Sequence, residues 1–379
     1  MGNRVLAMGR VPKVLHVISE VATPHNNNLM QALVASGCCT LKLYYSVKTV
    51  SMYSWKEDVF HAVGEPVIVG ERGIHWRLVW YSLTHPRENY LFIGWPNNTA
   101  RLLLVLFWLL RRPFLFWSDH PDENAVYPSY AAAIRQFLYH IVRTRARRIF
   151  LVGRRAVEHF QRQGYSAARL VNLPVFVRLG REKSDFMNER MSIRSKYEAV
   201  DSALLFVSGS RLTTAKGFDI LVEAAASVRE KVIRPFKVVI VGQGEQEPAL
   251  RQQIAEYGLT DVVVLEAWME PDEFEALIAS SDVYVHPARF DAFGGGTLHA
   301  MALGVPVIGS HGAGAVAERV VHGWNGQVFP SGRPDRLADC MVSILNDPGV
   351  LPEMGQRARR TAEEWPVERG VKIISEALV

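Results

Sequence analysis

The feature that most constrains this chain is an alternation of short apolar runs with longer helical stretches, and it occurs twice along 379 residues. Runs of this length read as buried strands, and strand–helix alternation is typical of a parallel sheet with helices on both faces. In the first half the expected strands lie at 13–19, 40–46, 89–95, 113–119 and 147–153, with helices at 27–37, 99–111 and 128–146.

A polar segment at 178–202, which reads as a linker with a short helix, separates this pattern from its second occurrence. The expected strands there lie at 203–209, 236–242, 261–267, 281–287, 305–310 and 326–330, and the helices at 216–231, 245–257, 271–280, 296–303, 312–322 and 333–346. The pattern predicts two doubly wound, Rossmann-like α/β domains. Ligands bind at the carboxyl ends of such strands, so we expect the active site in a central cleft between the domains.

The composition is that of a globular protein, with 49% apolar and 21% charged residues. Charge is distributed unevenly: residues 1–185 carry 24 Lys and Arg against 12 Asp and Glu, whereas 186–379 carry 19 against 26. A basic first half indicates an anionic surface or substrate as partner. Nucleic acid is not expected as a partner, because no nucleic-acid-binding motif accompanies the charge.

The location expected from the sequence is the cytoplasm. Cys38 and Cys39 are neighbours and Cys340 lies far away, so no disulfide framework is visible. The first 19 residues lack the uninterrupted apolar core of a signal peptide. The longest apolar run, at 102–110, is too short to span a bilayer.

Two glycine-containing stretches of the second half predict anion sites. In "SGSRLTTAKGFDILVEA" (208–224), Arg211 and Lys216 flank the expected start of a helix, where two cations favour a phosphate; two solvated surface cations are the alternative. In "FDAFGGGTLHAMALGVPVIGS" (290–310), backbone N–H groups of Gly295, Gly296 and Thr297 are free of bulky side chains at another helix start. A loose loop is the alternative there.

These stretches, together with "VIVGQGEQEPAL" and "SDVYVHPARFDAFGGGTLHAMALGVPVIGSHGAGAVAERVVHGWNGQVFP", resemble the nucleotide-sugar-binding domain of retaining GT-B glycosyltransferases. That large bacterial family, the group 1 glycosyltransferases, includes lipopolysaccharide and capsule mannosyl-, glucosyl- and rhamnosyltransferases. The resemblance covers about residues 203–330, and "EEWPVERGVKIISEAL" resembles the family's final tryptophan and its helix that crosses back to the first domain. The implied organisation is an acceptor-binding domain at 1–180, a linker at 181–202, a donor-binding domain at 203–364 and a crossing helix at 365–379.

The resemblance also implies roles for individual residues. Arg211 and Lys216 would hold the donor diphosphate. Asp291 and His299 stand where the family carries two glutamates that contact the donor sugar and the ribose, and Glu318 matches a later glutamate whose role is structural. The remaining expected donor contacts are Gly294, Gly295, Gly296, Thr297, Glu266 and Trp268.

The first half resembles the family less. "TPHNNN" replaces the usual glycine pair after the first strand, so Asn26, Asn27 and Asn28 are expected either to face the diphosphate or to cap the following helix. His120 lies where the family places a histidine beside the transferred sugar. A metal site at Asp119, His120 and Asp122 is the alternative, but no second ligand cluster supports it and no metal or other cofactor is expected.

The sequence thus predicts transfer of a sugar, with retention, from a nucleotide sugar to a hydroxyl of a cell-envelope glycan or lipid-linked acceptor. The alternatives are a non-catalytic nucleotide-sugar-binding subunit, or a GT-B epimerase or phosphorylase. An anionic membrane surface at the inner face of the membrane is a further expected partner, and a solvated basic face is its alternative. The arginines behind this expectation are Arg111, Arg112, Arg135, Arg143, Arg145, Arg147 and Arg148.

Overall fold

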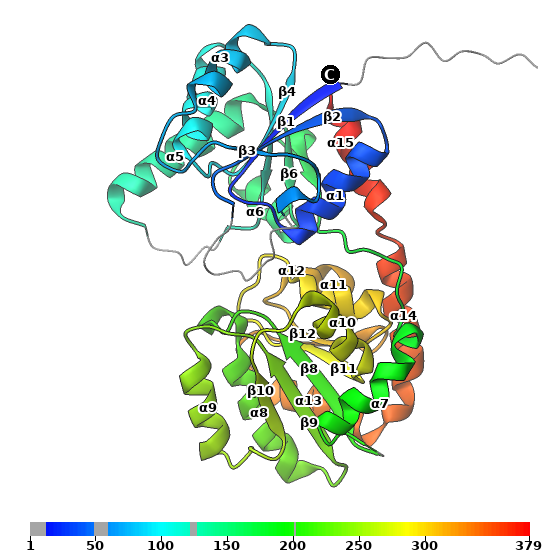
Figure 1. Ribbon diagram of the computed structural model, residues 1–379. Coiled ribbons are helices and arrows are strands. Elements are labelled where there is room, and N and C mark those ends of the chain that lie inside the picture. The colour runs from blue at the N-terminus through cyan, green and yellow to red at the C-terminus, as the bar shows by residue number, and fades with distance from the viewer. Residues whose placement is uncertain (1–12, 49–59, 122–126, 201) are drawn as a thin grey trace, which may run out of the picture.

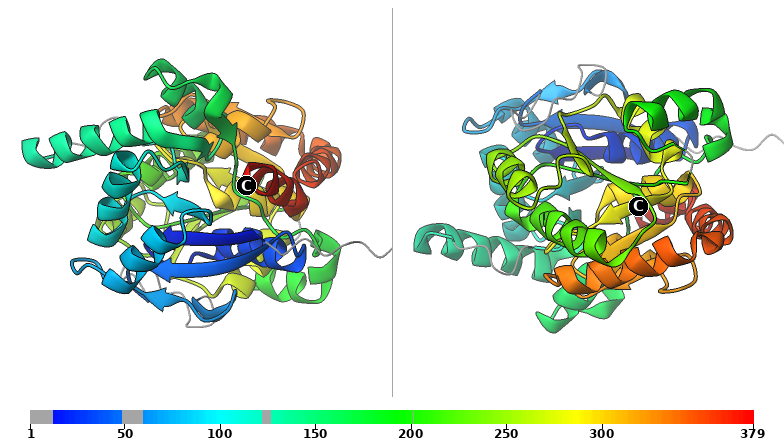
Figure 2. Two further views of the ribbon diagram at one scale, coloured as in Figure 1. Left: turned by 90° about the horizontal axis from the view of Figure 1, so that it is seen from above. Right: turned by 90° about the horizontal axis from the view of Figure 1, so that it is seen from below.

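The computed structural model describes residues 13–48, 60–121, 127–200 and 202–379, and it shows two α/β domains stacked one above the other (Figure 1). Views from above and below show helices on both sides of each sheet (Figure 2). This is the arrangement that the alternation of strands and helices predicts, because a sheet that is apolar on both faces must be covered on both.

Within the described residues the first sheet has seven parallel strands in the order β3-β2-β1-β4-β5-β6-β7. The strands are β1 (Lys13–Ser19), β2 (Cys39–Tyr45), β3 (Val67–Ile68), β4 (Asn89–Ile93), β5 (Phe114–Ser118), β6 (Ala146–Leu151) and β7 (Leu170–Asn172). The helices are α1 (Pro24–Ala35), α3 (Trp76–Thr84), α4 (Asn98–Leu109), α5 (Ser129–Arg145) and α6 (Arg154–Arg162).

The second sheet, as described, has six parallel strands in the order β10-β9-β8-β11-β12-β13. The strands are β8 (Leu204–Gly209), β9 (Phe236–Val241), β10 (Val263–Glu266), β11 (Val283–His286), β12 (Val307–Ser310) and β13 (Gly326–Phe329). The helices are α8 (Phe218–Lys231), α9 (Glu247–Glu256), α10 (Pro271–Ser280), α11 (Gly295–Ala302), α12 (Gly314–Arg319) and α13 (Pro334–Asn346).

The expected strands are confirmed to within two residues at each end, and the expected helices to within three. The start of α1 differs because Thr23 caps it: the Thr23 hydroxyl accepts a hydrogen bond from the Asn26 backbone N–H at 3.2 Å, and Pro24 occupies the first helical position. Several elements were not expected from the sequence, namely α3, β3, α6, β7 and α14 (Leu351–Glu363).

The polar segment between the domains is folded, and it packs against the second domain. It contains α7 (Met187–Lys196), which packs against α10 of the second domain. Arg194 donates a hydrogen bond to Asp282 at 2.9 Å, and Phe186 and Tyr197 on either side of α7 are buried in the second domain's core. The segment therefore extends the second domain.

The chain returns to the first domain through α15 (Val367–Ala377), as the resemblance implies (Figure 1). Helix α15 packs against α1, and Ile374 is fully buried among side chains of the first domain. Gly370 permits this contact, because a Cβ there would lie 2.5 Å from the Phe176 ring. Lys13 donates a hydrogen bond to the Leu378 carbonyl at 2.9 Å, which fastens this segment to β1.

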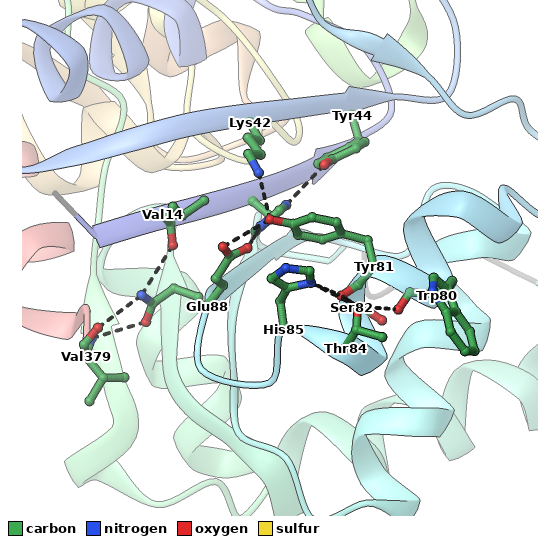
Figure 3. A network of polar contacts seen from close by, with 12 residues as sticks. Val14, Lys42, Tyr44, Trp80, Tyr81, Ser82, Thr84, His85, Glu88 and Val379 are labelled. Carbon is green, nitrogen blue, oxygen red and sulfur yellow. Dashed lines mark hydrogen bonds and ion pairs between the residues drawn. The ribbon is translucent and has the colours of Figure 1, made fainter. Parts of the chain in front are cut away.

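A polar network lies near the amino-terminal end of the first sheet (Figure 3). Buried His16 lies 2.5 Å from the Glu88 carboxylate and 3.1 Å from the Tyr44 hydroxyl. Tyr81 donates to Glu88 at 3.1 Å and accepts from Lys42 at 2.9 Å. These bonds join β1, β2 and α3 and satisfy groups whose burial would otherwise be costly, so we interpret the network as structural.

Candidate functional site

A cleft of about 840 Å³ lies between the domains and receives the carboxyl ends of strands from both sheets. From the first domain it is lined by segments that follow β1, β4 and β5, and from the second by segments that follow β8, β9 and β10. This is the position that doubly wound sheets predict for a ligand. The expected site residues that line it are Arg211, Lys216, Asp291, His120, Asn26, Trp268, Gly294, Gly295 and Gly296.

The loop between β8 and α8 brings the two cations to the cleft. Arg211 follows β8 by two residues, and Lys216 ends a short 3-10 turn just before α8. Gly217 joins this turn to α8 with a left-handed φ of 69°, and a Cβ there would overlap the Pro287 carbonyl oxygen. A glycine is therefore required to place Lys216 against the cleft.

Lys216 is paired with Asp291. The Lys216 ammonium donates to Asp291 Oδ2 at 2.5 Å, and His286 Nε2 lies 3.2 Å from the same oxygen. Burial opposes ionisation of Asp291, but the hydrogen bond with His286 and the charge of Lys216 outweigh it and hold the Asp291 pKa well below its usual range. Asp291 is thus an anion whose charge is directed at Lys216.

His286, which the sequence analysis did not select, organises this group. Because an ionised carboxylate only accepts hydrogen bonds, Nε2 carries a proton, and Nδ1 lies 3.1 Å from the Thr297 hydroxyl. Thr297 is fully buried and does not line the cleft. The signal for His286 was its position, since it ends the buried strand β11 five residues before Asp291.

Three glycines begin α11, and each of them faces a side chain of the protein. A Cβ at Gly294, whose φ is 99°, would lie 2.7 Å from the His286 ring. A Cβ at Gly295 would lie 2.8 Å from the His25 ring, and one at Gly296 would overlap the Tyr284 hydroxyl. Close packing by these side chains is a reason for the glycines that the sequence analysis did not foresee. The positive end of α11 still faces the cleft.

His299 does not line the cleft. Its ring lies 5.8 Å from the ring of His25, which belongs to the first domain and does line the cleft. Burial, with a smaller contribution from the neighbouring His25, lowers the pKa of His299 to about 4. Burial also lowers the pKa of His25, so both rings are neutral near pH 7, and their contact joins α1 to α11.

His120 sits where the two domains meet. Its Nδ1 donates to the Pro121 carbonyl at 2.7 Å. The His120 ring lies 5.8 Å from Phe290 of the second domain. Neighbouring Asp119 lines the cleft, where desolvation and the charge of Asp291 raise the Asp119 pKa.

The other expected contacts are more dispersed. Asn27 is buried, and neither it nor Asn28 lines the cleft, although Asn26 in the same part of α1 does. Glu266 Oε1 accepts from Lys196 at 2.8 Å and from Tyr197 at 3.0 Å, which directs the Glu266 carboxylate at α7.

Metal binding finds no support in the described part of the chain. No group of three or more His, Cys, Asp or Glu side chains among those residues is arranged to hold a metal ion. The alternative metal site included Asp122, which lies outside the described residues.

Comparison with known proteins places the second domain in a family. The model of "Glycosyl transferases group 1" matches residues 189–365. The alpha-D-kanosaminyltransferase of Streptomyces kanamyceticus is 26% identical over 70% of this chain and 67% of its own length. A GDP-mannose-dependent alpha-(1-6)-phosphatidylinositol monomannoside mannosyltransferase of Mycobacterium tuberculosis is 34% identical over 52% of this chain. That match spans only 51% of the mannosyltransferase.

Solved structures resemble the whole molecule in fold. HepE of Anabaena, solved with UDP-glucose, has a TM-score of 0.75 and 17% identity, with 96% of this chain and 99% of HepE covered. WaaG, a glycosyltransferase involved in lipopolysaccharide biosynthesis, has a TM-score of 0.68 and 16% identity, with 96% and 99% covered. The two-domain arrangement therefore matches these proteins across both sheets.

Proposed function

Because the chain belongs to the group 1 glycosyltransferases, a retaining family with the GT-B fold that uses nucleotide-sugar donors, we propose that it transfers a sugar from a nucleoside-diphosphate sugar to a hydroxyl of a glycan or glycolipid. The observation that carries this proposal is the convergence of Arg211, Lys216 and the positive end of α11 on one cleft. These are the groups that bind and stabilise a diphosphate.

Transfer with retention places the acceptor oxygen on the face of the sugar from which the diphosphate leaves. The bond from the anomeric carbon to the diphosphate oxygen breaks, the acceptor oxygen bonds to that carbon, and the acceptor proton passes to the departing phosphate. In this proposal Arg211 and Lys216 stabilise the negative charge that develops on the diphosphate, which lowers the barrier without a protein nucleophile.

Asp291 and His286 act in this scheme by holding Lys216. The two hydrogen bonds to Asp291 Oδ2 restrict both the carboxylate and the ammonium, so the cation is already in place when charge develops. His120, on the other side of the cleft, is the group of the first domain that we assign to the transferred sugar.

Replacement of the two cations tests the proposal. We expect Arg211→Ala and Lys216→Ala each to reduce turnover about a hundredfold or more, because each removes a preorganised positive charge. The measurement is glycoside formation from a panel of radiolabelled UDP-, GDP-, dTDP- and ADP-sugars. Lys231→Ala, which removes an exposed charge at the far end of α8, is the matched control.

The outcomes separate the alternatives. Nucleotide binding without any glycoside product would favour a non-catalytic binding subunit, and interconversion of the sugar nucleotide would favour an epimerase. Near wild-type turnover in both Ala variants would refute the diphosphate assignment.

The first domain is the part that we assign to the acceptor and to an anionic membrane. Two of the seven arginines that the sequence suggested for a membrane surface are engaged within the first domain instead. Arg112 is buried and donates to the His85 and Glu88 carbonyls at 3.0 and 3.2 Å, and Arg147 donates to Asn89 at 3.0 Å. No helix in the described part of the chain is both long and apolar enough to cross a bilayer, so a membrane contact would be a surface contact.

A further inference from the structure

A second pocket of about 510 Å³ opens beside the cleft in the first domain. It lies between α5 and α6, and it shares Pro121, Arg135 and Tyr139 with the wall of the cleft. The two cavities therefore meet at these three residues. In Figure 1, α5 runs outward from the first domain, with α6 nearer to the second domain.

The described residues that line this pocket carry positive charge. Arg135 and Arg143 line it, and none of the described residues that line it is acidic. Neither arginine forms an ion pair with a carboxylate among the described residues. Two guanidinium groups that pair with no carboxylate of the described residues attract an anion strongly, because each can bind its oxygens with paired hydrogen bonds.

Arg135 is held in place by aromatic rings rather than by a carboxylate. Its guanidinium lies 4.2 Å from the centre of the Tyr127 ring, 5.7 Å from Trp95 and 5.8 Å from Tyr139. Cation–π contacts of this kind fix the orientation of a guanidinium without neutralising its charge. Arg135 is thus positioned between the cleft and the second pocket.

The pocket also has the groups that a sugar needs. Tyr139, Phe160 and Tyr165 provide ring surface, while Gln136 and Gln163 provide amides for hydroxyl groups. His159 connects the pocket to the cleft, since its ring lies 5.2 Å from that of His120. A sugar seated here would therefore be next to the residue that we assign to the transferred sugar.

We propose that the pocket between α5 and α6 binds the acceptor through an anionic group, a phosphate or a carboxylate, carried on a sugar. This inference rests on the proposed function, because it assigns the acceptor to the same cleft. Arg135 and Arg143 bind the anionic group, and the sugar that carries it directs a hydroxyl toward the cleft.

Calorimetry with defined sugars tests the assignment on the full chain. Saturating UDP or GDP, whichever binds, first fills the diphosphate site, and glucose 6-phosphate, glucuronate and glucose are then titrated separately. We expect the phosphate or the carboxylate sugar to bind at least tenfold more tightly than glucose. The preferred one identifies the anionic group of the acceptor.

Variants locate the binding. Arg143→Gln and Arg135→Gln should each weaken binding of the anionic sugar about tenfold or more. Arg143 does not line the cleft, so its variant should leave nucleotide affinity unchanged. Arg143 is exposed, so its variant should fold even if loss of Arg135 disturbs the aromatic cluster. Arg162→Gln on α6, an exposed arginine that does not line the pocket, controls for a general effect of charge.

Three results would overturn this assignment. The first is equal affinity for glucose and for both anionic sugars, and the second is no binding of any of the three sugars. The third is unchanged binding of the anionic sugar in both pocket variants. Failure of the chain to bind any nucleotide would instead count against the proposed function. That result is read in the first titration, before any sugar is added.

Discussion

Gly296 shows how closely the residues around the cleft are packed. A Cβ at this position would overlap the hydroxyl of Tyr284, which is fully buried and donates to the Gly209 carbonyl at 3.1 Å. We expect Gly296→Ala to lower the free energy of unfolding by about 1–3 kcal/mol, as overpacking does. Urea denaturation measures this, and Gly73→Ala, where a Cβ meets nothing within 4 Å, should change stability by less than about 0.5 kcal/mol.

Tyr284→Phe provides the cross-check. Removing the hydroxyl should cost about 1 kcal/mol through the lost hydrogen bond, yet it makes room for the new methyl group. The double variant should therefore lose less stability than the two single variants added together. Strict additivity would show that the hydroxyl is not what excludes a side chain at Gly296.

His299 should make stability depend on pH. Burial lowers its pKa from 6.5 in the unfolded chain to about 4 in the folded protein. Between these values the unfolded chain binds the proton more readily, so the free energy of unfolding falls as the pH falls through this window. The loss approaches about 3 kcal/mol near pH 4 and is absent above pH 7.

Comparison with His299→Gln isolates this contribution, because glutamine does not titrate. Urea denaturation of both proteins at pH 7, 5.5 and 4 should show that the wild type loses more stability than the variant over this range. Asp291 does not contribute to this difference, because its lowered pKa means that its stabilisation is lost only below pH 4. Parallel pH profiles would contradict the burial of a neutral His299.

At the residue scale, the sequence identified the residues with recognisable chemistry but not their partners. Arg211 and Lys216 were selected by their position at the expected start of a helix, and Asp291 and His120 by the resemblance to the family. All four line the cleft. His286 and His25 were missed, because their importance comes from contacts with residues that are distant in sequence or in the other domain.

At the scale of elements, α6 shows why some helices escaped detection. It begins after Gly153, which has no side chain to cap it. Its first backbone N–H, that of Arg154, instead donates to Glu318 of α12 at 2.7 Å. A cap supplied from 164 positions away is invisible to local patterns. Helix α3 was missed for a related reason, because its cap is the unusual His75.

Glu318 therefore links the two domains, in agreement with the structural role that the resemblance implies. Its second oxygen accepts from Asn172 at 3.0 Å. We expect Glu318→Ala to lower the free energy of unfolding by about 2–3 kcal/mol, since it removes the acceptor of two hydrogen bonds and the carboxylate that lies 3.7 Å from the buried Arg319 guanidinium. Urea denaturation measures the loss. Glu158→Ala, at an exposed position on α6, should change stability by less than about 0.5 kcal/mol, and an equal loss in both variants would argue against the link.

At the scale of the whole molecule, the first domain has an exposed apolar face that we propose as the contact with an anionic membrane. Trp76, Trp80 and Leu83 are exposed on one face of α3, and the two tryptophans are 67% and 71% accessible. Exposed Arg77 lies on the same helix. We expect the protein to sediment with phosphatidylglycerol vesicles at low salt and to be released at high salt.

Trp80→Ser should weaken this sedimentation severalfold, because it removes an aromatic anchor. Trp324→Ser, which changes an exposed tryptophan of the second domain, should leave it unchanged. If wild type and Trp80→Ser sediment alike, α3 does not form the contact.

The arrangement of the two domains was predictable as a whole, because most strands of the two sheets are short, mainly apolar runs such as "FKVVIV" in β9. The placement of α7 was not predictable in the same way. Its residues are polar, and it joins the second domain through ion pairs such as that of Arg194 with Asp282. Only the folded structure brings such partners together.

Because α15 returns to the first domain, that domain can complete its fold only after the end of the chain has been synthesised. Domains usually fold as they leave the ribosome, the first one first. Here Ile374 and Leu378 belong to the core of the first domain, but they are translated after the whole second domain. The first domain must therefore wait, with the groove beside α1 unfilled, until its neighbour has been made. Its final closure and the joining of the two halves then become a single event.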